Sequence, residues 1–182
     1  MPTNTGHVFM AMSLDGFVAR EDFSLDWLMK QNTEGEAHGH EAFMSSVDCV
    51  VMGSGSFRTA LKFDIWPYEK PAVVLSKSLN PRDIPDKLRD KVSICELTPP
   101  EVMASLAEKG WQRVYVDGGK IIQSFLREGL ISDMTVTLVP ILIGSGKRMF
   151  GELDADIDLQ LLESSSFPSG LVTSRYRIVP LS

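Results

Sequence analysis

Short apolar runs alternate with polar and glycine-rich stretches along the chain, and the lengths of these runs predict a series of β-strands. The segments DCVVMG (48–53) and PAVVLS (71–76) are nearly continuous apolar runs, as expected for strands covered on both faces. The segment DMTVTLVPILI (133–143) alternates threonine with apolar residues, which is typical of a strand exposed on one side. Further strands are predicted at 7–12, 112–117, 157–164 and 171–179.

Helices are predicted where apolar residues recur at helical spacing. The clearest signal covers 98–110, where Thr98 is the expected N-cap and Glu101 completes a capping box. A second helix is predicted at 120–128, directly after a pair of glycines.

The order of these elements predicts the fold class. Strands separated by helices indicate an α/β fold, with a mainly parallel sheet and helices on both faces. The two late strands have no helix between them, which indicates an antiparallel C-terminal edge. We expect one domain over residues 1–182, with a sheet of about eight strands.

Composition narrows the classes of partner. The 182 residues are 43% hydrophobic and 23% charged, with a net charge of −6, which is typical of a soluble globular protein. An acidic chain lacks the basic face that nucleic acid or an anionic membrane requires. No apolar run reaches the roughly 20 residues of a membrane span. The start MPTNTGHVFM has no signal-peptide pattern, and Cys49 and Cys95 read as free thiols, so a cytoplasmic location is predicted.

The segment RVYVDGGKIIQSFL passes from strand to helix through Gly118 and Gly119 with no longer loop. In an open α/β sheet, ligands bind at the carboxyl ends of the strands, where helix N-termini present free amides. A phosphate could approach these bare amides closely, and Lys120 would add a cation. A tight turn that needs positive φ explains the glycines equally well, and both readings remain open at this point.

A second turn of the same kind follows the strand 48–53. There Gly53 and Gly55 alternate with Ser54 and Ser56 before a helix-like segment. Two such turns in one domain indicate a ligand with more than one phosphate, although neither contains a dinucleotide fingerprint.

The third strand end carries Ser76 and Lys77, a hydroxyl and a cation that could hold a further phosphate, such as a ribose 2′-phosphate. A solvated strand end is the alternative.

An acidic site is conceivable at Asp26 and Trp27, on a helix that Ser24 is expected to cap through residues 25–31. A carboxyl desolvated beside a large aromatic ring would have a raised pKa and could supply a proton. The alternative is that Asp26 only complements the helix dipole, and the residues alone favour this alternative.

Other motifs are rejected. His38 and His40 stand two residues apart and have no third ligand at a zinc spacing, so no metal site is predicted. The segment GSGKR (144–148) is not a P-loop, because Ile141 replaces its first glycine and Arg148 its final serine or threonine.

Six motifs together resemble a known family. MAMSLDGFVA, SLDWL, VVMGSGSF, AVVLSK, VYVDGGKIIQSFL and LVPILIGSGKRMFG occur in this order over nearly the whole chain. The chain resembles the dihydrofolate-reductase-like superfamily. The closest branch is the one that shares the C-terminal reductase domain of bacterial riboflavin biosynthesis.

The resemblance implies an eight-stranded sheet and a bound NADPH across the carboxyl ends of the strands. It also implies that the loop 13–19 covers the reacting ring. Asp26, with Trp27 beside it in the substrate pocket, falls where folate reductases carry the carboxylate that aids protonation. The implied cofactor-binding residues are Ala11, Val18, Gly53, Ser54, Gly55, Ser56, Phe57, Leu75, Ser76, Lys77, Gly118, Gly119, Lys120 and Ile121.

Two positions depart from folate reductases. Those enzymes grip the cofactor's 2′-phosphate with an arginine where this chain has Ser54. They bind the glutamate carboxylate of folate with another arginine, and Lys70, the nearest match, offers no bidentate fork. NADPH is the implied cofactor, with NADH not excluded, and folate as the natural substrate stays open.

The predicted function is therefore an NADPH-dependent reductase. It would transfer hydride to a small nitrogen heterocycle or a ribosylamino-pyrimidine, like dihydrofolate reductase or 5-amino-6-(5-phosphoribosylamino)uracil reductase. One alternative is a non-catalytic dinucleotide-binding module. Another is a hydrolase or transferase, for which no nucleophile or metal cluster is identifiable. The resemblance also implies a homodimer formed through the late strands, with an edge at 133–143.

Overall fold

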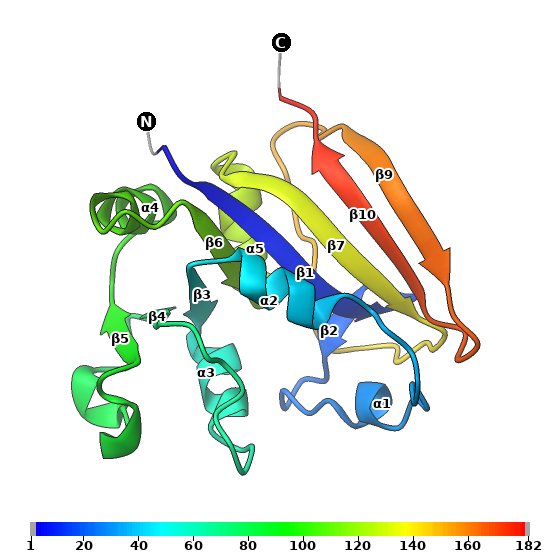
Figure 1. The fold of residues 1–182 in the computed structure, drawn as a ribbon, viewed down its shortest axis with the longest axis horizontal. Coiled ribbons are helices and arrows are strands. Elements are labelled where there is room, and N and C mark those ends of the chain that lie inside the picture. Colours follow the sequence, from blue (N-terminus) through cyan, green and yellow to red (C-terminus); the bar gives the residue numbers. More distant parts are fainter. Residues whose placement is uncertain (1–2, 181–182) are drawn as a thin grey trace.

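The computed structural model describes residues 3–180, which build an eight-stranded sheet with helices on both faces (Figure 1). The strand order is β5-β4-β3-β6-β1-β7-β10-β9. All neighbours from β5 to β7 are parallel, and β10 is antiparallel to both β7 and β9, which confirms the predicted fold class. The strands are β1 (Thr5–Ser13), β3 (Cys49–Gly53), β4 (Ala72–Leu75), β5 (Val92–Cys95), β6 (Arg113–Asp117), β7 (Ile131–Val139), β9 (Leu159–Ser166) and β10 (Val172–Ile178).

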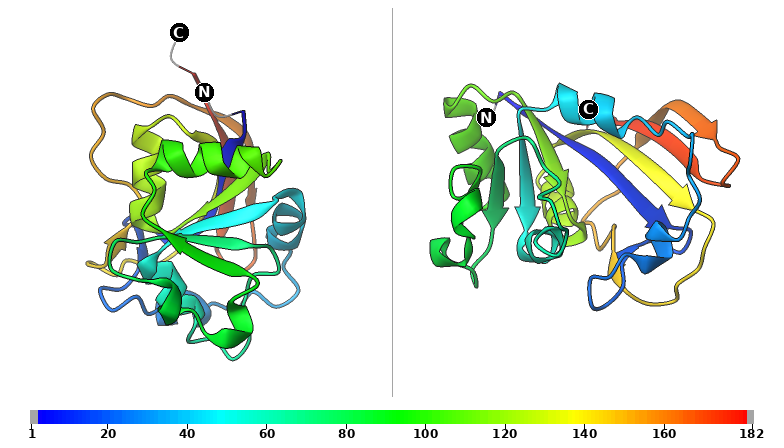
Figure 2. Two further views of the ribbon diagram at one scale, coloured as in Figure 1. Left: turned by 90° about the vertical axis from the view of Figure 1, so that its left-hand side faces the viewer. Right: turned by 60° about the horizontal axis from the view of Figure 1, so that its bottom comes forward.

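Helices cover the two faces of the sheet because alternate strand residues point to opposite sides. On one face, Val51 packs with apolar residues of α4 and α5. On the other face, Val50 packs with Phe57 of α3 and Phe43 of α2. The ribbon views show helices on both sides of the sheet (Figure 2). The helices are α1 (Asp26–Met29), α2 (His40–Ser46), α3 (Ser54–Ala60), α4 (Pro99–Glu108) and α5 (Gly119–Arg127), with 3₁₀ turns η1 (Pro81–Asp83) and η2 (Asp86–Leu88).

Several predicted boundaries are corrected. The strand predicted at 133–143 ends at Val139, because Pro140 has no N–H to donate to a sheet. It is also not an edge, since β7 lies between β1 and β10. Ser24 does not cap α1: Leu25 is its N-cap residue, and the helix has only four residues. The capping box of Thr98 at α4 is confirmed.

Part of the loop predicted at 13–19 is a strand. β2 (Phe17–Ala19) pairs antiparallel with β8 (Lys147–Arg148) in a second, two-stranded sheet. β5 was also not among the predicted strands. Both β2 and β8 are too short to show a periodic pattern, and they depend on each other for hydrogen bonds.

Cys49 and Cys95 are free, as predicted, and burial raises the pKa of the Cys49 thiol to about 12. Within residues 3–180, no three His, Cys, Asp or Glu side chains gather as a metal site requires. No helix in that range is long and apolar enough to cross a membrane.

Candidate functional site

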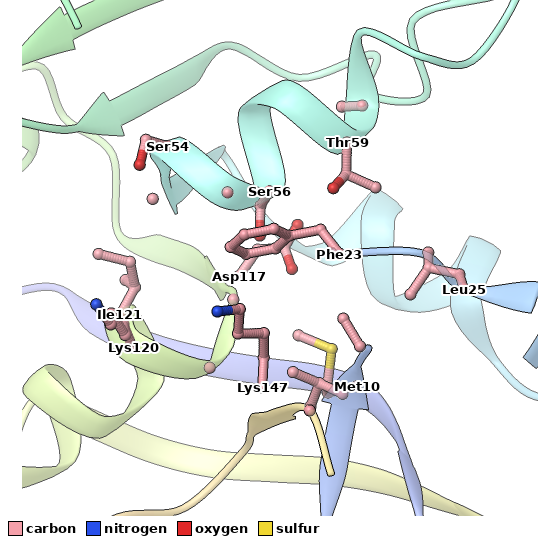
Figure 3. Close-up of a pocket in the computed structure, with 18 of the residues that line it drawn as sticks. Met10, Phe23, Leu25, Ser54, Ser56, Thr59, Asp117, Lys120, Ile121 and Lys147 are labelled. Atoms are coloured by element: carbon pink, nitrogen blue, oxygen red, sulfur yellow. The ribbon is translucent and has the colours of Figure 1, made fainter. Parts of the chain in front are cut away.

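A cavity of about 500 Å³ opens where β3 and β6 end and their helices begin (Figure 3). Further walls come from β2 and the segment after it, from β8, from the loop that carries Phe63 and Tyr68, and from Met10 and Leu75. Ser54 and Lys120 lie at one end of the cavity, and Met10 and Leu25 lie at the other (Figure 3). This is the place where open α/β sheets bind their ligands.

Sheet register brings the two glycine turns together. Met52 pairs with Asp117 across β3 and β6, so the turns that follow these strands leave the sheet side by side. A Cβ on Gly118 would lie 2.7 Å from the Ser56 hydroxyl oxygen, and Gly118 has a φ of 106°. Only glycine adopts this conformation without strain.

Gly119 is also required by packing. A Cβ at this position would collide with the backbone oxygen of Arg148 on β8. Gln123 of α5 donates a hydrogen bond to the same oxygen at 3.0 Å. The fold itself therefore requires both glycines: Gly118 because of its positive φ, and Gly119 because of its contact with Arg148.

Most of the predicted cofactor residues line the cavity. Four do not: Ala11 packs beside Trp27, the Phe57 side chain is buried in the core, and Ser76 and Lys77 lie outside the cavity wall. The Ser76 hydroxyl accepts hydrogen bonds from the amides of the turn that follows it. Those that line the cavity are Val18, Gly53, Ser54, Gly55, Ser56, Leu75, Gly118, Gly119, Lys120 and Ile121.

Asp26, which the resemblance implied as the catalytic carboxyl, lies outside the cavity wall, and the raised pKa considered for it is not found. The Arg20 guanidinium binds both carboxylate oxygens, at 2.6 and 3.1 Å, and the carboxylate is exposed. This hydrogen bonding by Arg20 lowers the pKa of Asp26. Trp27 is fully buried against Val139 and Leu171 and likewise does not line the cavity.

A different carboxyl faces the cavity. Asp117 is the last residue of β6, directly before the glycine pair, and only 8% of it is exposed. Burial raises its pKa, against the opposing effect of a hydrogen bond donated by the Tyr68 hydroxyl. Burial also raises the pKa of Tyr68, so this residue stays a neutral donor.

Sequence reasoning missed Asp117, Tyr68 and β8. The sequence did offer a signal for Asp117, because this residue directly precedes the two glycines at the predicted end of a strand. Tyr68 belongs to a loop without a pattern. GSGKR was rejected as a P-loop and entered the resemblance within LVPILIGSGKRMFG. Neither use predicted that its Lys147 lines the cavity and pairs with Glu21 at 3.3 Å.

The RibD C-terminal domain family matches residues 5–173, nearly the whole chain. The chain belongs to this family. Its sheet and helices have a RibD-like reductase fold.

Among solved structures, a "Putative riboflavin biosynthesis protein" from Shewanella sp. PV-4 is similar, with a TM-score of 0.89, 36% identity and coverage of 97% of this chain and 99% of that one. The uncharacterized protein YwjB of Bacillus subtilis is 29% identical over 164 residues, covering 88% of this chain and 90% of YwjB.

A more distant structure supports the fold alone. The diaminohydroxyphosphoribosylaminopyrimidine deaminase/5-amino-6-(5-phosphoribosylamino)uracil reductase of Thermotoga maritima has a TM-score of 0.71 at 11% identity. The match covers 97% of this chain and 57% of that longer protein.

Proposed function

We propose that this protein is an NADPH-dependent reductase that transfers hydride to a small nitrogen heterocycle or a ribosylamino-pyrimidine. The observation that carries the proposal is the meeting of two strand-to-helix turns and one buried carboxyl, Asp117, on a single cavity.

The donor groups of the cavity fit a diphosphate-linked dinucleotide. The first amides of α5 have no carbonyl partner within the helix, and Lys120 adds a cation beside them. No hydrogen bond among residues 3–180 engages the hydroxyls of Ser54 and Ser56. Gly119 is already packed against Arg148, so the fit depends on these donors rather than on empty space at that glycine.

NADPH, when bound, supplies the hydride, and the protein's own residues place and protonate the acceptor. Reduction of a C=N bond adds hydride to carbon and a proton to nitrogen. Because burial raises the pKa of Asp117 and favours its protonated form, this carboxyl can hold that proton at its Oδ atoms. Tyr68 orients the carboxyl through its hydrogen bond.

The cavity lining supports an aromatic acceptor. Met10, Leu25 and Phe63 give its wall an apolar surface that suits the faces of a flat heterocycle. Asp117 offers a ring nitrogen one polar contact.

A turnover assay tests the proposal. Purified protein is mixed with NADPH or NADH and a panel of pterins and ribosylamino-pyrimidines, and loss of nicotinamide fluorescence is followed. We expect consumption of NADPH with at least one acceptor. NADPH binding without turnover on any acceptor would favour the dinucleotide-binding module, and absence of binding would contradict both.

We also propose that the protein is a homodimer formed through its last strands. β9 is an edge strand whose residues are almost all exposed, including Leu159 at 44% and Leu161 at 55%. Exposed edges of this kind pair with another chain, and a second copy offers a self-complementary partner.

Sedimentation velocity checks the dimer. At micromolar concentration we expect a dimer for the wild type and a monomer for Leu161→Lys, because a buried lysine at a symmetric contact would repel its copy. A monomeric wild type would contradict the proposal.

A further inference from the structure

Phe23 has an unusual backbone conformation. Its φ is 65°, and it is the one non-glycine residue between 3 and 180 with a positive φ. A bulky aromatic residue is strained in this region, and such strain persists only where surrounding contacts hold it.

The contacts that hold Phe23 lie inside the cavity. A Cβ on Gly55 would collide with the Cε1 atom of the Phe23 ring and would lie within 3 Å of two neighbouring ring carbons. On another side, the Lys147 ammonium lies 4.8 Å from the ring centroid. The ring therefore lies between α3 and β8, across the middle of the cavity (Figure 3).

Hydrogen bonds join the two ends of the segment 20–26, which carries Phe23. Arg20 binds Asp26 through two hydrogen bonds, and the Arg20 amide donates to the Ser24 carbonyl at 3.1 Å. The Phe23 amide donates to the Arg20 carbonyl at 2.9 Å. Displacement of the Phe23 ring with a change of its φ would break the hydrogen bond from the Phe23 amide, while the Arg20–Asp26 pair holds the base of the loop.

These contacts give a structural reason for glycine at position 55. The space that its missing side chain leaves is filled by the Phe23 ring, which lies beside Ser56 where the proposed dinucleotide must pass (Figure 3).

We propose that residues 20–26 form a latch, in which the Phe23 ring closes the cavity by seating against Gly55 and must leave before a dinucleotide binds. This inference rests on the proposed function for the identity of the ligand. The closed state itself rests only on contacts within the chain. Release of the φ strain at Phe23 favours opening, and the contacts with Gly55 and Lys147 oppose it.

The latch is first tested without ligand. Gly55→Ala adds a Cβ where the ring now lies, and the end of a side chain gives way more easily than backbone, so the variant folds with the ring displaced. We expect hydrogen exchange at the Phe23 and Ser24 amides to become about tenfold faster, as in local opening. Unchanged exchange in folded Gly55→Ala would overturn the latch.

The second test measures NADPH association by stopped-flow fluorescence. Phe23→Ala and Gly55→Ala both raise the association rate roughly three- to tenfold, because the open population no longer limits binding. Phe150→Ala is the matched control: its side chain is 38% exposed, against 37% for Phe23, and it does not line the cavity.

The outcomes separate the two proposals. Weaker NADPH binding in Phe23→Ala would overturn the latch and make the ring a binding platform. If Gly55→Ala weakened binding while exchange at the Phe23 amide stayed at the wild-type rate, Gly55 would serve only to admit the ligand and the latch would again be wrong. Absence of NADPH binding in the wild type and in both variants would contradict the proposed function, while the exchange experiment would still decide the latch.

Discussion

Asp117→Asn lowers the turnover number by about 100-fold or more, and it leaves the affinity for NADPH little changed. Asparagine keeps the size of the side chain and can still accept the Tyr68 hydrogen bond, so the fold is retained. It cannot transfer a proton. Steady-state kinetics together with a nicotinamide binding titration measure the two quantities separately.

The direction in which the reaction rate changes with pH follows from the pKa of Asp117. Burial raises the pKa of Asp117, so the active, protonated form is complete below that pKa and the rate falls as pH rises through it. Stability has the same sign: the contribution of this carboxyl is present below its unfolded pKa and is lost as pH rises through the folded one. Asp117→Asn should remove both effects.

Two further variants show which carboxyl supplies the proton. The Tyr68 hydrogen bond lowers the pKa of Asp117, so Tyr68→Phe should move the alkaline limb of the profile to higher pH. Asp26→Asn should keep this limb, because the pKa of Asp26 is already lowered by Arg20. If Asp26→Asn lost the alkaline limb and Asp117→Asn kept it, the proton donor would be Asp26 and not Asp117.

Gly119→Ala destabilises the protein by about 2 to 3 kcal/mol, because the new Cβ meets the Arg148 backbone and neither α5 nor β8 can yield cheaply. Urea unfolding measures the change. Gly129→Ala is the matched control: its φ is 66° and a Cβ there would meet nothing within 4 Å, so its cost is about 1 kcal/mol from backbone conformation alone.

The two glycine variants separate packing from ligand binding. If Gly119 served only to admit a phosphate, Gly119→Ala would unfold at the same urea concentration as the wild type and would lose only NADPH affinity. Equal stability of Gly119→Ala and the wild type would therefore contradict the packing account.

Local sequence signals were sufficient for the elements that surround the site. The runs ending at Gly53 and Asp117 carry strand, turn and helix signals within a few residues, so β3, α3, β6 and α5 were predictable. The order of strands and helices likewise predicted the parallel sheet with its antiparallel edge.

The remaining features depend on contacts between distant residues. Asp117 owes its environment to Tyr68, 49 residues away, and no spacing rule connects the two. The two residues of β8 have a strand conformation only because they pair with β2. The ionised state of Asp26 follows from Arg20, whose position depends on how the loop closes.

In the proposed complex, one dinucleotide contacts both glycine turns at once. Amide NMR spectra of the wild type, recorded during titration with NADPH, test it directly. We predict saturable binding, with the largest shift changes at Ser54–Ser56 and at Gly118–Ile121 together. Absence of saturable binding, or shift changes confined to one turn or to residues away from the cavity, would contradict the account.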